Sequence, residues 1–112
     1  MVSLGIETAA CAYSIYHHTA SQAMVCTGLM YYNATSLYDW VTYRSMSRVS
    51  GSFEEIDRYG FSGKTECGVC MVSSKNYPHR LYVGGVSGSA IVVRMSGYSA
   101  TDTWTHMSRN YR

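Results

Sequence analysis

Charged side chains are scarce in this chain of 112 residues, where Asp, Glu, Lys and Arg together make up 14%. Lysine and glutamate are few, whereas tyrosine, serine, glycine and threonine are abundant. This balance is more typical of a secreted, loop-rich protein than of a cytosolic one. The formal net charge of +2 is spread along the chain rather than clustered, so it favours a nucleic-acid partner only weakly.

Long apolar runs are also missing. No apolar stretch approaches eighteen residues, which excludes a membrane-spanning helix. The opening Met1-Val2-Ser3 does not have the form of a signal peptide, and we interpret Met1 as a start codon placed on a mature secreted chain. The length predicts a single domain, residues 1–112, with one core.

Alternating apolar and polar positions, or apolar runs bounded by turn residues, predict β-strands at both ends of the chain. The first is expected as part of an N-terminal β-hairpin. The others are separated by glycine, serine and proline signals. The expected strands cover residues 11–16, 66–72, 80–83, 90–95 and 101–106.

A different pattern follows the first strand. Thr19 and Gln22 have the spacing of a capping box, and apolar residues then recur at i, i+4 and i+7 as Val25, Leu29 and Tyr32. This predicts an amphipathic helix over residues 20–32, whose apolar face would lie on the sheet of later strands.

Two further segments lie between this helix and the later strands. Residues 37–43 fit either a helix or a strand, since helical spacing competes with a high content of β-branched and aromatic residues. Ser52 and Glu55 form a second capping box, which predicts a short helix over residues 53–59 before Gly60.

The even number of cysteines favours two disulfides in a small secreted domain, each worth about 2–4 kcal/mol, with free thiols and zinc as alternatives. Cys67 and Cys70 form one zinc knuckle, but Cys11 and Cys26 lie too far apart to form the second. On a strand Cys67 and Cys70 point to opposite faces, so each needs a partner from the other pair. We predict a bond from Cys26, on the expected helix, to Cys67 on the sheet beneath it.

A run in the second half carries a resemblance. The pattern Tyr82-x-Gly84-Gly85-x-x-Gly88-x-x-x-Val92-Val93, followed by Thr105-His106, is similar to the core of the small guanyl-specific ribonucleases of fungi. Upstream, Cys11, Ala20-Ser21-Gln22, Cys26 and Tyr31-Tyr32 resemble that family's N-terminal cysteine and single helix. The middle of the chain matches poorly. The resemblance implies an α+β fold with one main α-helix packed on a central antiparallel sheet, and it favours a strand at residues 37–43.

The resembling enzymes cleave RNA by attack of the ribose 2′-oxygen on phosphorus, using a glutamate base, a histidine acid, an arginine and a second histidine. The acid carries over to His106. The arginine position is Ile91, the second histidine falls near Trp40, and the base falls near Gly68. Glu66 would share a strand face with Gly68 and is the candidate substitute base.

A scaffold without its catalytic set resembles the ribonuclease-like effectors of plant-pathogenic fungi, notably powdery mildews. The resemblance implies a secreted, monomeric pseudoenzyme that enters host cells, binds a host protein or RNA without cleaving it, and is recognised by plant intracellular immune receptors. It implies no cofactor and no metal. One alternative is an active or residual ribonuclease or ribotoxin that uses His106. The other is an unrelated small secreted protein similar to killer toxins.

Aromatic residues supply the candidate RNA contacts, because their rings can stack on bases. The alternative is that most of these rings belong to the core. Asn33-Ala34-Thr35 is a glycosylation sequon. The tripeptide Tyr77-Pro78-His79 also occurs in the ribonuclease family, but elsewhere in the order of elements, and we treat it as coincidence. The candidate contacts are Tyr38, Trp40, Tyr43, Trp104 and His106.

Overall fold

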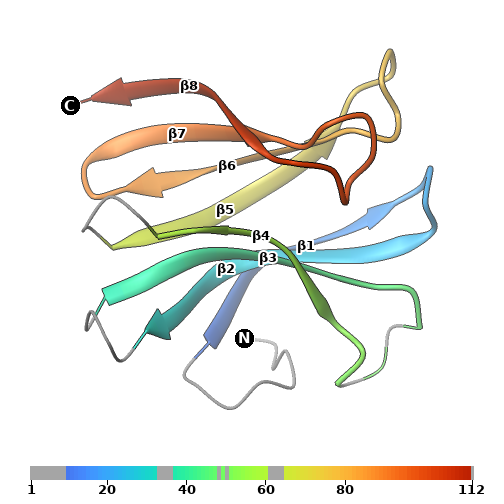
Figure 1. Ribbon diagram of the computed structural model, residues 1–112, viewed down its shortest axis with the longest axis horizontal. Helices are drawn as coiled ribbons and strands as arrows, with labels where there is room; N and C mark the ends of the chain where they lie inside the picture. The colour runs from blue at the N-terminus through green and yellow to red at the C-terminus, as the bar shows by residue number, and fades with distance from the viewer. Residues whose placement is uncertain (1–9, 33–36, 48, 50, 61–64, 112) are drawn as a thin grey trace.

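The computed structural model describes residues 10–32, 37–47, 49, 51–60 and 65–111, and every regular element in them is a β-strand. The strands form two antiparallel sheets in which each strand pairs with its neighbour in sequence, in the orders β1-β2-β3-β4 and β5-β6-β7-β8 (Figure 1). None of the described residues forms a helix that could cross a membrane. The strands are β1 (Ala10–His18), β2 (Ala23–Tyr32), β3 (Leu37–Ser45), β4 (Glu54–Tyr59), β5 (Glu66–Ser73), β6 (Leu81–Ser87), β7 (Ala90–Met95) and β8 (Thr105–Tyr111).

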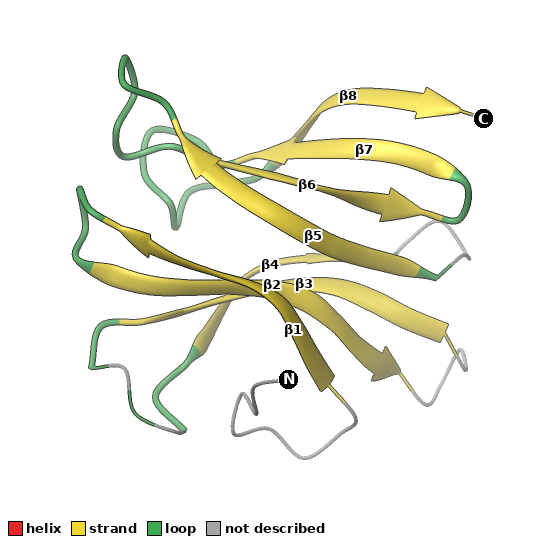
Figure 2. Cartoon of the chain, turned by 180° about the vertical axis from the view of Figure 1, so that it is seen from behind, coloured by secondary structure: helices red, strands yellow, loops and turns green. Residues whose placement is uncertain are grey.

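The two sheets lie face to face, with β5 crossing over the first sheet (Figure 2). The main core lies between them and draws buried side chains from both sheets and from the loop before β8. Burying one large apolar side chain contributes about 1.5–3 kcal/mol, so this layer is the main source of stability. Its buried members are Ala23, Val25, Trp40, Tyr59, Leu81, Val83, Ala90, Val92, Ala100 and Trp104.

The predicted α+β fold is wrong, because the segment expected to be its main helix is strand β2. The Thr19–Gln22 spacing belongs to the turn of the β1–β2 hairpin, where Gln22 adopts a positive φ of 61° and its side chain donates to the Thr19 carbonyl. β2 is buried on both faces, with Val25 in the main core and Cys26 in a second cluster. A strand buried on both sides loses the alternation of apolar and polar residues, and its apolar positions then also satisfy helical spacing.

The short helix expected over residues 53–59 is also wrong, since this segment is strand β4. The segment left open between helix and strand is β3. The N-terminal hairpin is confirmed as β1 and β2, and β5, β6 and β7 occur where strands were predicted, although β6 continues to Ser87, beyond the expected end at residue 83. β8 begins at Thr105, later than expected, because residues 96–104 form a loop.

The two sheets repeat one plan. Each first strand contains a β-bulge, at Tyr13 in β1 and at Val69 in β5. Beside each bulge the second strand carries a glycine, Gly28 or Gly85, where a Cβ would overlap a carbonyl oxygen of the bulged strand. Bulges bend a strand and increase its twist, so each first hairpin needs a glycine at this close approach.

A further bulge recurs in the last strand of each sheet, at Ile56 in β4 and at Met107 in β8. The two sheets differ in which face is buried beside the glycine of the second strand. The face that carries Gly85 packs against the first sheet, whereas the face that carries Gly28 points away from the second. That outer face holds its own buried cluster, so the central strands β2 and β3 are buried on both faces, whereas Ile15 of β1 is exposed. The cluster consists of Cys26, Val41 and Tyr43, with Ala12, Met30 and Phe53 packed against them.

Candidate ligand-binding site

The residues carried over from the ribonuclease resemblance do not meet in one site. Glu66 is fully buried at the start of β5, where the Ser87 hydroxyl donates to its carboxylate at 2.5 Å. His106 is exposed on β8, three strand spacings away or about 14 Å across the sheet. Ile91 is exposed on the outer face of the same sheet, and Gly68 packs against the first sheet. This arrangement does not place a base and an acid on either side of one phosphate.

The charged groups near His106 are engaged with each other. Arg94 of β7 is buried and donates to both carboxylate oxygens of Asp57 in β4, at 2.6 and 2.7 Å, so this ion pair joins the two sheets. The Arg94 guanidinium also lies over the Tyr59 ring, 5.0 Å from its centroid. The His106 ring meets the same Tyr59 ring edge-on at 4.6 Å. The cluster has the geometry of a structural clamp between sheets.

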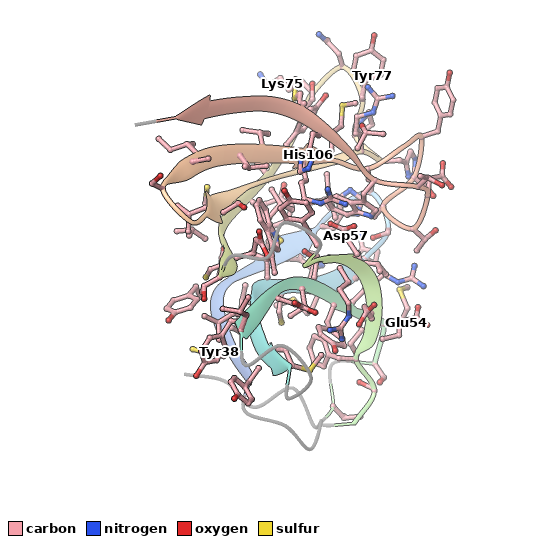
Figure 3. All side chains as sticks on the ribbon, turned by 60° about the vertical axis from the view of Figure 1, so that its left-hand side comes forward. Tyr38, Glu54, Asp57, Lys75, Tyr77 and His106 are labelled. Carbon is pink, nitrogen blue, oxygen red and sulfur yellow. The ribbon has the colours of Figure 1, made fainter. Side chains whose placement is uncertain are left out.

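The aromatic residues proposed as RNA contacts are mostly interior. Trp40 and Trp104 belong to the main core, and Tyr43 to the second cluster. Tyr38 is partly buried and its ring packs edge-on against Tyr31 at 5.3 Å. Figure 3 shows Tyr38 far from His106, so these rings do not form one surface.

All four cysteines are free thiols, which contradicts the two predicted disulfides. Cys26 packs on the outer face of the first sheet, turned away from the second sheet that carries Cys67. Burial raises the pKa of the Cys26 thiol to about 11, and burial together with nearby Cys11 does the same for Cys67. Cys70 is exposed. The glycosylation candidate Asn33 lies outside the described residues.

Tyrosine, histidine and arginine side chains gather at the loop end of the second sheet, around the tripeptide Tyr77-Pro78-His79. The loop between β5 and β6 and the loop between β7 and β8 meet there and line an open pocket of about 190 Å³. Figure 3 shows Tyr77 and Lys75 at this extremity of the molecule. We call this pocket the Tyr–Arg site, and it is lined by Asn76, Tyr77, Pro78, His79, Arg80 and Tyr98.

Arg80 is the centre of the Tyr–Arg site. Its guanidinium lies over two rings, 4.9 Å from the centroid of Tyr77 and 5.8 Å from that of Tyr98. Its Nε donates to the Gly97 carbonyl at 3.2 Å, which links the two loops. The rings are exposed to solvent, Tyr77 by 55% and Tyr98 by 85%. The site therefore presents a cation in contact with two solvent-exposed aromatic side chains.

Local sequence sets the shape of the β5–β6 loop. Pro78 follows Tyr77, and the Arg80 amide donates to the Tyr77 carbonyl at 3.0 Å, which closes a β-turn with proline at its second position. Before the turn, the Asn76 amide donates to the Ser74 hydroxyl. The turn projects Tyr77 outward and returns Arg80 to the start of β6.

The second loop is shaped by Asp102. Its carboxylate accepts hydrogen bonds from the amide and the hydroxyl of Ser99, and a Cβ at Gly97 would crowd its side chain. These contacts form a compact turn that leaves Tyr98 pointing into solvent. They also direct the Gly97 carbonyl to Arg80.

The electrostatics of the site are cationic. Within the described residues the ion pairs involve Arg44, Arg58 and Arg94, and neither Arg80 nor Lys75 takes part in one. Arginine has five N–H donors in a planar fork suited to phosphate and carboxylate. Of the N–H donors of Arg80, only Nε has a hydrogen-bond partner among the described residues, so the other donors of this pocket-lining side chain are left for a ligand.

A scan of protein-family models, a search of curated proteins and a search of solved structures find no match to this chain. The geometry of the Tyr–Arg site and the separation of the predicted catalytic residues are thus the observations that bear on function. Of the two, only the Tyr–Arg site brings together residues that can bind a ligand.

Proposed function

We propose that this protein binds single-stranded RNA at the Tyr–Arg site and does not cleave it. The observation that carries the proposal is the Arg80 guanidinium that lies over two exposed tyrosine rings, with no carboxylate of the described residues paired to it. Stacking of bases on aromatic rings, together with cationic contacts to phosphate, is how proteins bind single strands. In an RNA strand every nucleotide supplies a base that can stack on a ring and a phosphate that can bind the cation.

Charge favours RNA over a protein partner as the occupant. Tyrosine and arginine are also common at the centres of protein interfaces, where they are buried by apolar neighbours. Here Arg80 in the site and Lys75 in the same loop form no ion pair with a carboxylate of the described residues, and Asp102 is bonded to its own loop. An occupant that carries negative charge along its length satisfies them better than a neutral protein surface.

The lack of cleavage is supported by the distance and burial of the candidate groups. Glu66 is out of contact with solvent, and Arg94 is already bound to Asp57, so neither can serve a phosphate near His106. The further role predicted for the chain, as a secreted effector that plant immune receptors recognise, stays a prediction. Its ribonuclease-like fold is not the fold of this protein.

The binding experiment uses fluorescence anisotropy with a labelled RNA of about ten nucleotides, long enough for one site of this size. We expect binding that weakens steeply between about 50 and 200 mM salt. Tyr98→Ala should weaken it about 5- to 150-fold, the range for losing one stacked base. Arg80→Gln should weaken it about tenfold or more, because charge-assisted hydrogen bonds to phosphate are lost.

Arg44→Gln is the matched control, since it removes the same charge from a partly exposed arginine that pairs with Glu54 on the first sheet. It should leave RNA affinity almost unchanged. Absence of binding by the wild type at low salt would overturn the proposal and leave a protein partner as the occupant. Equal losses for Arg44→Gln and Arg80→Gln would also overturn it, because binding would then follow net charge and not the site. DNA of the same sequence reports whether the 2′-hydroxyl contributes.

A separate assay tests catalysis. Purified wild type and His106→Ala, incubated with total RNA and a guanosine-containing dinucleotide, should both leave the RNA intact. A histidine acid without a base or a charge stabiliser gives no measurable rate, since such groups work as a unit. Cleavage by the wild type that disappears in His106→Ala would establish the ribonuclease alternative instead.

A further inference from the structure

The loop that carries Tyr77 and Arg80 is tied to the first sheet by one histidine. His18 ends β1 and is fully buried. Its Nε2 lies 2.7 Å from the Pro78 carbonyl, in the middle of the turn that shapes the site, and its Nδ1 lies 2.6 Å from the Ser21 hydroxyl. Both ring nitrogens are thus engaged, one with the turn of its own hairpin and one with the β5–β6 loop.

The chemistry of these two partners fixes the protonation state. A carbonyl oxygen can only accept, so Nε2 carries the hydrogen and donates it to Pro78. Nδ1 is then the acceptor of the neutral ring, and the Ser21 hydroxyl donates to it. Adding a second proton would turn Nδ1 into a donor, reverse the bond to Ser21, and place a charge at a site without solvent contact.

The surroundings of the ring also oppose that charge. Burial lowers the pKa of His18 below its ordinary value of 6.5, the bond to Pro78 partly offsets this, and the neighbouring His79 and His17 lower it further. His17 comes from β1 and His79 from the β5–β6 loop, so both elements disfavour a charge on the His18 ring. The Tyr16 ring lies 6.4 Å away on the same strand.

We infer that His18 is a pH-sensitive latch that holds the Tyr–Arg site in its binding arrangement at neutral pH and releases it in acid. When the ring is neutral, its bond to Pro78 fixes the turn that orients Tyr77 and Arg80. When the ring is protonated, the buried charge favours conformations in which His18 reaches water, and these break the bond to Pro78. The effect on RNA rests on the proposed function, whereas the latch itself does not.

The sign of the linkage follows from the lowered pKa. A histidine with a lower pKa in the folded state than in the open state takes up a proton on opening, so acid favours opening. The closed loop is fully favoured above about pH 6.5, the ordinary histidine pKa, and loses stability as the pH falls below it toward the pKa of the closed state. One proton changes the opening equilibrium by at most about tenfold per pH unit.

The first test uses ligand-free protein and is independent of RNA. Nitrogen NMR of the His18 ring should show the hydrogen on Nε2 at pH 7.5. Between pH 7.5 and 5, the Arg80 amide and the Tyr77 ring signals should shift with the midpoint of His18. In His18→Gln the shifts linked to that midpoint should vanish, because the glutamine amide can still donate to Pro78 but does not titrate. His17→Gln, an exposed neighbour, is the matched control and should keep them.

The second test measures the RNA dissociation constant at pH 7.5 and 5.5 for wild type and His18→Gln. Because both proteins keep His79 and His17, the difference between their pH profiles isolates His18. We expect the wild type to lose more affinity in acid than the variant, by up to about tenfold for each pH unit. The latch would be overturned if the NMR signals of the Arg80 amide and the Tyr77 ring did not shift with the midpoint of His18. Identical RNA profiles would overturn the control of RNA binding by the latch, and if no RNA binds, the NMR titrations of the wild type and His18→Gln decide.

Discussion

Replacing Asp57 by asparagine should lower the free energy of unfolding by about 3–5 kcal/mol, the usual result of leaving one buried charge without its partner. Arg94 and Asp57 are both buried, and their two hydrogen bonds cross between the sheets. Asparagine keeps the size and one acceptor but not the charge. For a domain of this length we expect the melting temperature to fall by roughly 10–20 °C.

Glu54→Gln is the control for Asp57→Asn, because it also neutralises a carboxylate that pairs with an arginine. The Arg44–Glu54 pair lies at the surface, with the Glu54 side chain 60% exposed, and such pairs contribute at most about 1 kcal/mol. A double variant, Asp57→Asn with Arg94→Met, removes the stranded charge and should recover part of the loss. If urea denaturation gave Asp57→Asn and Glu54→Gln equal losses, the ion pair would not be the clamp between the sheets.

The second sheet is the part of the fold that the sequence predicts better, because turn residues mark the ends of its strands. The loop at residues 74–80 and the turn at residues 88–89 separate short apolar runs, and such runs bounded by turn residues indicate strands, although Val86 and Ile91 lie exposed on the outer face. Strands β2 and β3 of the first sheet lack a comparable signal because both of their faces are buried. In β2 the inward Val25 and the outward Cys26 are equally buried, and the pattern no longer distinguishes a strand from a helix.

The Tyr–Arg site could be predicted only in part. The sequence Tyr77-Pro78-His79 indicates a turn, because proline presets the backbone at the second position of a β-turn. The proposed binding role of the Tyr–Arg site also depends on Tyr98, from the loop between β7 and β8, and on His18, from the other sheet. Contacts between segments so far apart in the sequence cannot be recognised from the spacing of neighbouring residues. The predicted catalytic residues failed for the same reason. Glu66 and His106 were assigned from a linear match, and the strand order places them at opposite edges of one sheet.

Two adjacent glycines in β6 provide the sharpest test of the repeated plan. Gly85→Ala should prevent folding or lower stability by more than about 4 kcal/mol, because its Cβ would overlap a backbone carbonyl of β5 that cannot move without breaking the bulge. Gly84→Ala should change stability by less than about 1 kcal/mol, since its Cβ would meet only the Cys70 Sγ, at 3.0 Å, the free end of an exposed side chain.

Gly28 extends this test to the first sheet. Its place beside the bulge of β1 matches that of Gly85 beside the bulge of β5, although one glycine faces outward and the other faces the core. If the close approach at the bulge sets the requirement, Gly28→Ala should be as damaging as Gly85→Ala. If burial between the sheets sets it instead, Gly28→Ala should be tolerated as well as Gly84→Ala. Soluble yield, circular dichroism and urea denaturation of the three variants separate these outcomes. Tolerance of alanine at both bulge positions would contradict the pairing of β1 with β2 and of β5 with β6.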